Sequence, residues 1–312
     1  MTDGGWAPCA ILLATYQGER YLPAQLDSLA WQRHGAWQLL WRDDGSSDRT
    51  LALLDDFARA RPPGTVRRVE TPAERLGAMG SFMALLAAAP DDAPVAFCDQ
   101  DDVWLPDKLE RALAALAALP SGRPALYCAR QRIVDEDLRE IGLSPSLRRP
   151  PGFRNALVQN IATGCTMVLN PEARRLVLSV PPPAGSMHDW WAYLMVSGCG
   201  GTVIFDDEPA ILYRQHGANA VGAAAGFLTR SRQALRRGAG RFLGLLAAHM
   251  RALAGAPLTP ENRRLLEDLP VLAEAGPLRR LRGLRRARLY RQGRAEDLLL
   301  WLWVGSRPLP PP

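Results

Sequence analysis

The sequence predicts an α/β fold in which a mostly parallel β-sheet is covered by helices on both faces. Three observations lead to this prediction. From residue 9 to residue 119, short apolar runs alternate with segments whose apolar residues recur every three or four positions. Acidic residues follow two of the apolar runs, where strands of such a sheet would end. After Gly222 the composition becomes rich in Ala, Leu and Arg, which predicts a helical C-terminal region.

The strands and helices of the first half are predicted from these patterns. Apolar runs of four to eight residues predict strands, and amphipathic segments of about ten residues predict helices. The expected strands are "CAILLAT" (9–15), "WQLLWRDD" (37–44), "TVRRVE" (65–70) and "PVAFCDQ" (94–100), and the expected helices cover 20–32, 48–60, 80–89 and 106–119.

The pattern is looser after Pro120. It predicts a long strand over 125–137, a short strand over 163–170 and a helix from Pro171. Residues 181–217 predict a loop, a helix and two strands, and the helical remainder is interrupted at 255–262. We therefore expect two parts, 1–220 and 221–312.

Composition restricts the class of protein. Of the 312 residues 47% are hydrophobic and 22% charged, as in globular proteins. There is no uninterrupted apolar run of about 18 residues and no basic segment before a long apolar one, so we expect neither a membrane span nor a secretory signal. The five cysteines include no C-x-x-C pair, which favours reduced thiols in a cytoplasmic protein.

Charge is distributed unevenly. From Val221 onward there are 17 arginines, no lysine and six acids, whereas the preceding residues carry 21 basic and 26 acidic side chains. The basic segment 278–294 lies next to "LLLWLWV" (298–304). This pairing is typical of a helix on an anionic membrane surface, but also of a packed helix with a solvated arginine face, or of coding bias towards Arg. No nucleic-acid-binding module is evident, and we expect no nucleic-acid partner.

Two acidic clusters occupy the predicted rim of the sheet. In "FCDQDDVWLPDK" (97–108), Asp99 and Asp101 can face one hard cation, although a solvated loop or a turn has the same pattern. In "RDDGSSD" (42–48), a turn with Asp48 as helix N-cap explains part of the pattern. It does not explain the adjacent pair Asp43 and Asp44, which would need hydrogen bonds, for instance from a pyrimidine base and a ribose.

Six segments in this order resemble the inverting nucleotide-sugar glycosyltransferases of family 2, and most closely their rhamnosyltransferase-like branch. The resemblance covers about Cys9 to Val221. It implies a GT-A catalytic domain over 1–220, a divalent cation (Mn²⁺ or Mg²⁺), a nucleotide-sugar donor and a saccharide or lipid-linked saccharide acceptor in bacterial surface-polysaccharide synthesis. The segments are "LLATYQGERYLPAQLDSLAWQ", "WRDDGSSDRT", "FCDQDDVWLPDKL", "TGCTMVLN", "HDWW" and "YRQHGANAVG".

The resemblance also implies a role for single residues. Thr15 and Tyr16 would line the base pocket, and Asp44 would accept from the base. Asp101 would coordinate the cation, with Asp99 near it and near the ribose. Asp102 would support the residues that contact the donor and the cation, and Arg75 would contact the diphosphate. Ser81 occupies the position where the family often has Asn.

"HDWW" (188–191) supplies the candidate general base, Asp189. The alternative is that Asp189 caps a helix whose Trp190 and Trp191 are core residues; these two and Trp104 are candidates for stacking on a sugar as well as for core packing. His216 is either a cation ligand, as in some relatives, or an ordinary surface or core histidine. Beyond it, Gly217 and Asn219 would shape a loop over the donor.

Two other functions remain open from the sequence. A nucleotidyltransferase also uses paired acids and Mg²⁺, but "ATYQGERY" (14–21) lacks the Gly-rich basic phosphate loop that such an enzyme normally carries. A non-catalytic sugar-binding scaffold with a degenerate site is the other alternative. Ser81 in place of Asn favours it, whereas the acids at 44, 99, 101 and 189 argue against it.

Overall fold

The computed structural model describes residues 7–71, 75–216, 227–274 and 276–310, without the side chains of 227–237. The chain forms two compact units that interleave along the sequence. The sequence composition suggests one boundary near residue 220. In the structure, two segments that precede this boundary, Leu147–Ile161 and Ser179–Val203, belong to the same unit as the C-terminal helices. The first unit comprises Met1–Ser146, Ala162–Leu178 and Ile204–Ala224, and the second comprises Leu147–Ile161, Ser179–Val203 and Ala225–Pro312.

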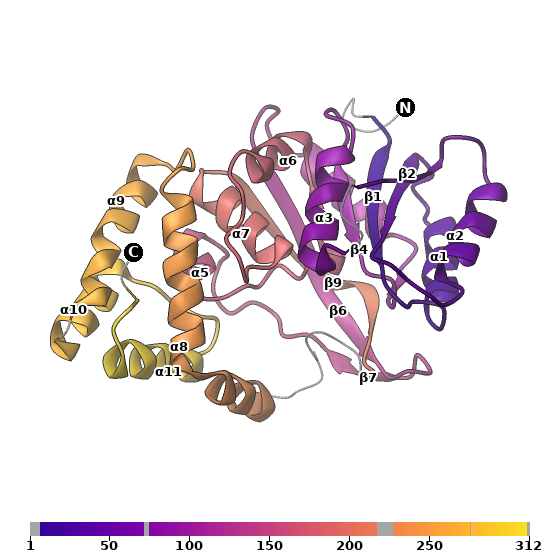
Figure 1. The fold of residues 1–312 in the computed structure, drawn as a ribbon. Helices are drawn as coiled ribbons and strands as arrows, with labels where there is room; N and C mark the ends of the chain where they lie inside the picture. Colours follow the sequence, from indigo (N-terminus) through magenta and orange to yellow (C-terminus); the bar gives the residue numbers. More distant parts are fainter. Residues whose placement is uncertain (1–6, 72–74, 217–226, 275, 311–312) are drawn as a thin grey trace. The chain divides into compact units, whose positions relative to one another are not determined.

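The first unit is built on a nine-stranded sheet with the order β3-β2-β1-β4-β8-β6-β9-β5, and β7 pairs with β6 (Figure 1). Strands β3, β2, β1 and β4 are parallel, whereas β8 is antiparallel to β4 and β6. The strands are β1 (Cys9–Thr15), β2 (Trp37–Asp43), β3 (Val66–Arg68), β4 (Val95–Cys98), β5 (Val103–Trp104), β6 (Ala125–Val134), β7 (Glu140–Leu143), β8 (Val168–Leu169) and β9 (Thr202–Arg214).

Helices cover both faces of the sheet, as predicted. Alternate residues of β1, Ile11 and Leu13, join a buried cluster with residues of α1, α2 and α4. On the opposite face, Phe82 of α3 packs edge-on against Phe97 of β4. The helices of this unit are α1 (Leu22–Ala30), α2 (Thr50–Arg59), α3 (Gly77–Ala88), α4 (Lys108–Ala117) and α6 (Pro171–Leu178), with a short 3₁₀ turn at Gly164–Thr166.

Strand register brings the carboxyl ends of β1, β2 and β4 to one edge. Thr15 lies opposite Asp43, and Leu13 lies opposite Cys98. Because parallel strands end at the same edge, the loops after them share one rim. This rim carries both acidic clusters.

The structure corrects three details of the sequence prediction. Residues 202–214 form one long strand, β9, rather than two strands. The short strand β5, which was not predicted, pairs with β9 through Val103 and Leu212. Asp48 is not the N-cap of α2, because that position is Arg49; Asp48 instead accepts from the backbone N–H of Thr50 at 3.0 Å.

The second unit is helical. Helix α7 is buried on nearly all sides, with Trp191 and Tyr193 fully inaccessible. Helix α8 contains a break at Gly238, whose φ of 73° is not helical. No helix among the described residues is long and apolar enough to span a bilayer. The helices are α5 (Phe153–Ala156), α7 (His188–Gly198), α8 (Phe227–Leu253), α9 (Pro260–Asp268), α10 (Pro277–Ala287) and α11 (Arg294–Ser306), with a 3₁₀ segment, η2, at Leu269–Ala273.

Candidate active site

The first acidic pair on the rim is satisfied partly within its own loop. Asp43 Oδ1 accepts from the backbone N–H groups of Gly45 at 3.0 Å and Ser46 at 2.7 Å. Its Oδ2 accepts from Thr15 Oγ1 at 3.0 Å, which ties the end of β1 to the end of β2. Asp43 therefore organises the rim, and it needs no ligand to explain its position.

Asp44 is held by a buried arginine that the sequence prediction missed. Arg42 is 2% exposed and donates from Nη1 to Asp44 Oδ1 at 2.6 Å and to Ser81 Oγ at 2.7 Å. The N–H groups of Leu76 and Gly77 donate to the same carboxylate at 2.6 and 2.9 Å. Burial alone would raise the pKa of Asp44, but these hydrogen bonds lower it overall, so the carboxylate is ionised.

The loop after β1 is locked to the loop after β2. Three successive backbone N–H groups, of residues 17, 18 and 19, donate to Ser46 Oγ, Thr50 Oγ1 and Asp48 Oδ2 at 2.8, 2.8 and 3.0 Å. These contacts fix the position of the preceding residue, Tyr16. Tyr16 is 43% exposed, and the Arg75 guanidinium lies 5.3 Å from the centre of its ring. Tyr16 and Arg75, both predicted donor contacts, are thus neighbours.

Gln100 connects the β1 loop to the loop after β4. Its amide accepts from Tyr16 N and donates to Tyr16 O, both at 2.9 Å. A Cβ on Gly18 would lie 2.4 Å from Gln100 Oε1, so Gly18 leaves room for this contact. The middle residue of "DQD" therefore ties the loop after β4 to the loop after β1.

The second acidic cluster includes one predicted ligand pair. Asp101 Oδ2 lies 2.8 Å from His216 Nε2 at the end of β9. Candidate ligand atoms of Asp99, Asp102 and Cys165 lie within 4.8 Å of one another. The structure thus brings His216 to Asp101, and groups Asp99 with Asp102.

Asp102 lies beneath this cluster. It is 1% exposed, and its Oδ1 accepts from the backbone N–H of Arg214 at 3.3 Å. Among the described residues Oδ2 has no hydrogen-bond partner. Burial, followed by the charges of Asp101 and Asp99, raises the pKa of Asp102 well above its ordinary value.

A divalent cation fits this set of side chains. Carboxylate oxygens with one imidazole are ligands that Mn²⁺ accepts, and carboxylates alone suit Mg²⁺. A bound cation would offset the burial of Asp102 and the negative charges of Asp101 and Asp99 near it. Asp99 and Asp102 are the carboxylates whose ligand atoms lie close enough together to hold it, and Asp101 and His216 form a separate close pair.

Lys108 provides fixed positive charge below the acids, and the sequence prediction gave it no role. It is fully buried, donates from Nζ to Cys165 O at 2.7 Å and lies 3.1 Å from the centre of the Trp104 ring. Burial lowers its pKa to about 8, so the side chain is mostly charged at pH 7. The available signal was a lysine at the start of the helix that follows the aspartate cluster, six residues after Asp102.

The candidate base, Asp189, belongs to the second unit. It lies in the first turn of α7, 5% exposed, and its Oδ1 accepts from Trp190 N at 2.6 Å. The N-cap is Met187, so Asp189 is not the capping residue. Trp190 is held in turn by donation from Nε1 to Ala156 O at 2.7 Å.

His249 of α8 supports this turn, and it too was missed. Its Nε2 lies 2.8 Å from Ser186 Oγ, three residues before Asp189. Its ring lies 5.2 Å from that of Trp190 and 6.3 Å from that of Trp191. Burial lowers the pKa of His249 to about 4, so the imidazole is neutral at pH 7.

Two of the tryptophans are not available to a sugar. Trp104 and Trp191 are at most 2% exposed and pack in the interiors of their units. Trp190 is partly exposed. Gly217 and Asn219 lie outside the described residues.

The fold is that of the GT-A glycosyltransferases. The structure resembles S. aureus TarS 1–349 in complex with UDP-GlcNAc, with a TM-score of 0.60 and 15% identity over 96% of this chain and 90% of that chain. It also resembles the mannosyltransferase PcManGT from Pyrobaculum calidifontis in complex with GDP-Man and Mn²⁺, with a TM-score of 0.52 and 18% identity over 96% and 81%. Residues 10–168 match glycosyl transferase family 2, and the chain belongs to this family.

Two characterised relatives are involved in sugar transfer. The chain is 26% identical over 237 residues to the dTDP-rhamnosyl transferase RfbG of Shigella flexneri. The matched region covers 69% of this chain and 75% of RfbG. It is 30% identical over 188 residues to WfgD of Escherichia coli, covering 60% and 68%. WfgD is described as a UDP-Glc:alpha-D-GlcNAc-diphosphoundecaprenol beta-1,3-glucosyltransferase.

Proposed function

We propose that the protein is a metal-dependent, inverting glycosyltransferase that transfers rhamnose from dTDP-rhamnose to a hydroxyl group of a lipid-linked saccharide. In this proposal the reaction belongs to bacterial surface-polysaccharide synthesis and takes place in the cytoplasm, at the inner face of the membrane. The proposal rests on the Asp101–His216 contact beside Asp99 and Asp102, at the rim where β1 and β4 end. Similarity to RfbG supports the donor, and similarity to WfgD supports the acceptor class.

The donor would bind along this rim. The base would lie in the pocket of Thr15 and Tyr16. Asp44 Oδ2 accepts one hydrogen bond, from Gly77, among the described residues, so a lone pair remains for a base N–H. Arg75, beside Tyr16, would contact the diphosphate. Asp99 would lie close to the ribose.

Asp189 would act as the general base. Its carboxylate would take the proton of the acceptor hydroxyl while that oxygen forms a bond to the anomeric carbon. The bond from that carbon to the diphosphate oxygen breaks in the same step, which inverts the anomeric configuration. A cation held by Asp99, Asp101 and His216 would neutralise charge on the departing diphosphate.

Nucleotide release from a panel of donors, with Mn²⁺, Mg²⁺ or EDTA, tests this function. We expect dTDP-rhamnose to give the highest rate and EDTA to abolish release. Asp189→Asn should still bind the donor but lose transfer by about 100-fold or more, since general-base catalysis contributes at least this factor. Release from a UDP-sugar instead would replace the donor, and binding without any release would favour the non-catalytic scaffold.

A further inference from the structure

Helix α10 carries a face made only of positive charge. Four arginines, 282, 285, 286 and 288, line an open cavity of about 520 Å³, and no acidic side chain lines it. Arg282, Arg285 and Arg286 are three and four positions apart, so they share one side of the helix. We call these four residues the arginine face.

The charges of the arginine face are not neutralised within the described part of the chain, where none of the four forms an ion pair. Other arginines of the same helix are used differently. Arg279 pairs with Glu274 at 3.2 Å, and buried Arg280 donates to the carbonyls of Val304 and Gly305, both at 2.7 Å. Helix α10 therefore carries two kinds of arginine. Arg279 and Arg280 have partners within the protein, whereas the arginines of the arginine face repel one another unless an anionic partner binds.

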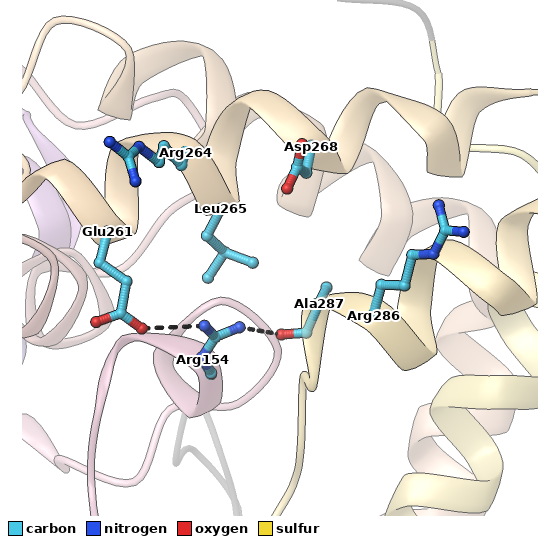
Figure 2. A pocket seen from close by; sticks show the side chains of 7 residues that line it. All are labelled: Arg154, Glu261, Arg264, Leu265, Asp268, Arg286 and Ala287. Atoms are coloured by element: carbon cyan, nitrogen blue, oxygen red, sulfur yellow. Dashed lines mark hydrogen bonds and ion pairs between the residues drawn. The ribbon is translucent and has the colours of Figure 1, made fainter.

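Arg286 also borders a second pocket, which contains acidic side chains. It lies at one side of a smaller pocket of about 270 Å³ between α5, α9 and α10, which Glu261 and Asp268 also line (Figure 2). In that pocket Glu261 pairs with Arg154 at 3.1 Å, and Arg154 also donates to Ala287 O. Two of the charged residues that line this pocket, Arg154 and Glu261, are thus paired with each other, whereas no ion pair is formed within the described residues by the arginine face.

Arg288 occupies a backbone position that favours glycine. It is the C-cap of α10, with φ 50° and ψ 36° in the left-handed region. A side chain is strained there, and Gly or Asn usually takes the position. The arginine at this cap adds a fourth positive charge to the arginine face.

Exposed leucines accompany the charge. Leu278 on α10 is 70% exposed, and Leu298 and Leu302 on α11 are 61% and 60% exposed. Leu298 and Leu302 are four positions apart and so share one side of α11. The two helices are in contact, since Leu281 lies 3.5 Å from the position a Cβ on Gly305 would take. Leu278 lies four positions before Arg282 and so shares its side of α10. Arginines with an exposed leucine on the same side of a helix fit an interface between lipid headgroups and acyl chains, whereas a soluble polyanion would use only the arginines.

We propose that the arginine face, with Leu278, Leu298 and Leu302, docks this protein on an anionic phospholipid bilayer. This surface deepens the proposed function, because it would bring the enzyme to the membrane that holds a lipid-linked acceptor. The docking itself does not depend on transfer.

Sedimentation of the full-length protein with vesicles tests the proposal. We expect binding to phosphatidylcholine vesicles that contain phosphatidylglycerol, little binding to phosphatidylcholine alone, and weakening by salt as the screening length falls. The variant Arg282→Gln/Arg285→Gln/Arg286→Gln should lose about 100-fold in affinity, since each arginine near such a surface contributes roughly fivefold. Equal binding to both vesicle types, or an unaffected triple variant, would overturn the proposal.

Matched variants separate this surface from net charge and from folding. Arg33→Gln/Arg59→Gln/Arg123→Gln removes the same charge from exposed positions of the first unit and should keep wild-type binding; an equal loss would mean that only net charge matters. Arg288→Gly should not lower the thermal midpoint, because glycine suits the cap, yet it should weaken vesicle binding about fivefold. Unchanged vesicle binding would remove Arg288 from the surface.

The leucines distinguish a bilayer from other polyanions. Leu298→Ser/Leu302→Ser should lower the vesicle binding that persists at high salt and leave binding to a single-stranded oligonucleotide unchanged. Oligonucleotide binding tighter than vesicle binding, with no effect of the leucines, would overturn the membrane assignment. Nucleotide release from a soluble donor, measured on the same variants, separates a failure of the docking proposal from a failure of the proposed function. Nucleotide release by a protein that does not bind vesicles would refute the docking surface and leave the proposed function intact.

Discussion

At the scale of single residues, the site depends on buried charges that are paired across the fold. Arg42 satisfies Asp44 and Ser81 together. Lys108 lies below the aspartates and bonds to Cys165 O. Buried charges are tolerated only with such partners. The aspartates therefore reach the rim already oriented, before any ligand binds.

Ser81 is a buried residue of the rim. It is 1% exposed and accepts a hydrogen bond from Arg42. Ser81→Asn should therefore destabilise the protein by about 1–3 kcal/mol through overpacking, without improving donor binding. Ser81→Ala should cost about 1 kcal/mol for the lost hydrogen bond. Urea unfolding and donor titration measure both effects, and a stable Asn variant with tighter donor binding would contradict this view.

His216 should contribute to cation affinity. Because its Nε2 lies 2.8 Å from Asp101 Oδ2, His216→Ala removes either a ligand or the group that orients one. We expect Mn²⁺ affinity to fall roughly 10- to 100-fold. The electron paramagnetic resonance signal of free Mn²⁺ measures this affinity. His34→Ala is the matched control, because His34 bonds to Ala36 O in a separate loop. Equal Mn²⁺ binding by both variants would exclude His216.

At the scale of elements, His249 links α8 to the first turn of α7. Its folded pKa of about 4 lies below the ordinary value of 6.5, so the unfolded chain binds more protons between these values. Stability should therefore rise with pH across this window, by up to about 3 kcal/mol from this residue, and should be lower below pH 4.

The variant His249→Gln isolates this contribution, because it removes the titrating group and keeps a polar side chain. Its free energy of unfolding, followed by urea titration from pH 4 to 7, should depend less on pH than that of the wild type. If the free energy of unfolding depends on pH equally in the two proteins, the pKa of His249 is not lowered by burial.

The regular elements of residues 9–119 were predictable because local periodicity determines them. Strand β5 was not, since two residues have no period and their partner Leu212 is more than 100 positions away. The acids of the site were found by their place after strands, whereas Arg42, Lys108 and His249 were not. Whether a long basic side chain or a histidine is buried depends on tertiary partners such as Cys165 O and Ser186, which no local pattern specifies.

At the scale of the whole molecule, the C-terminal helices complete the unit that carries the candidate base. Thr259 N and Asn262 Nδ2 donate to Gly198 O at 3.1 and 2.9 Å, at the end of α7. A fragment ending at residue 224 should therefore expose the aromatic side chains of α7, bind a hydrophobic dye and lose transfer. Co-expression of residues 225–312 should restore a dye-negative, active protein. Full transfer by the fragment alone would contradict this dependence.

The interleaving of the two units also has a consequence for synthesis on the ribosome. The chain passes between the units five times, and the last segment of the first unit ends at Ala224. The sheet can thus close while α8–α11 are still being made. During that interval Trp191 and Tyr193 have been translated but lack part of their final covering, so a chaperone that binds aromatic segments has a defined period in which to act.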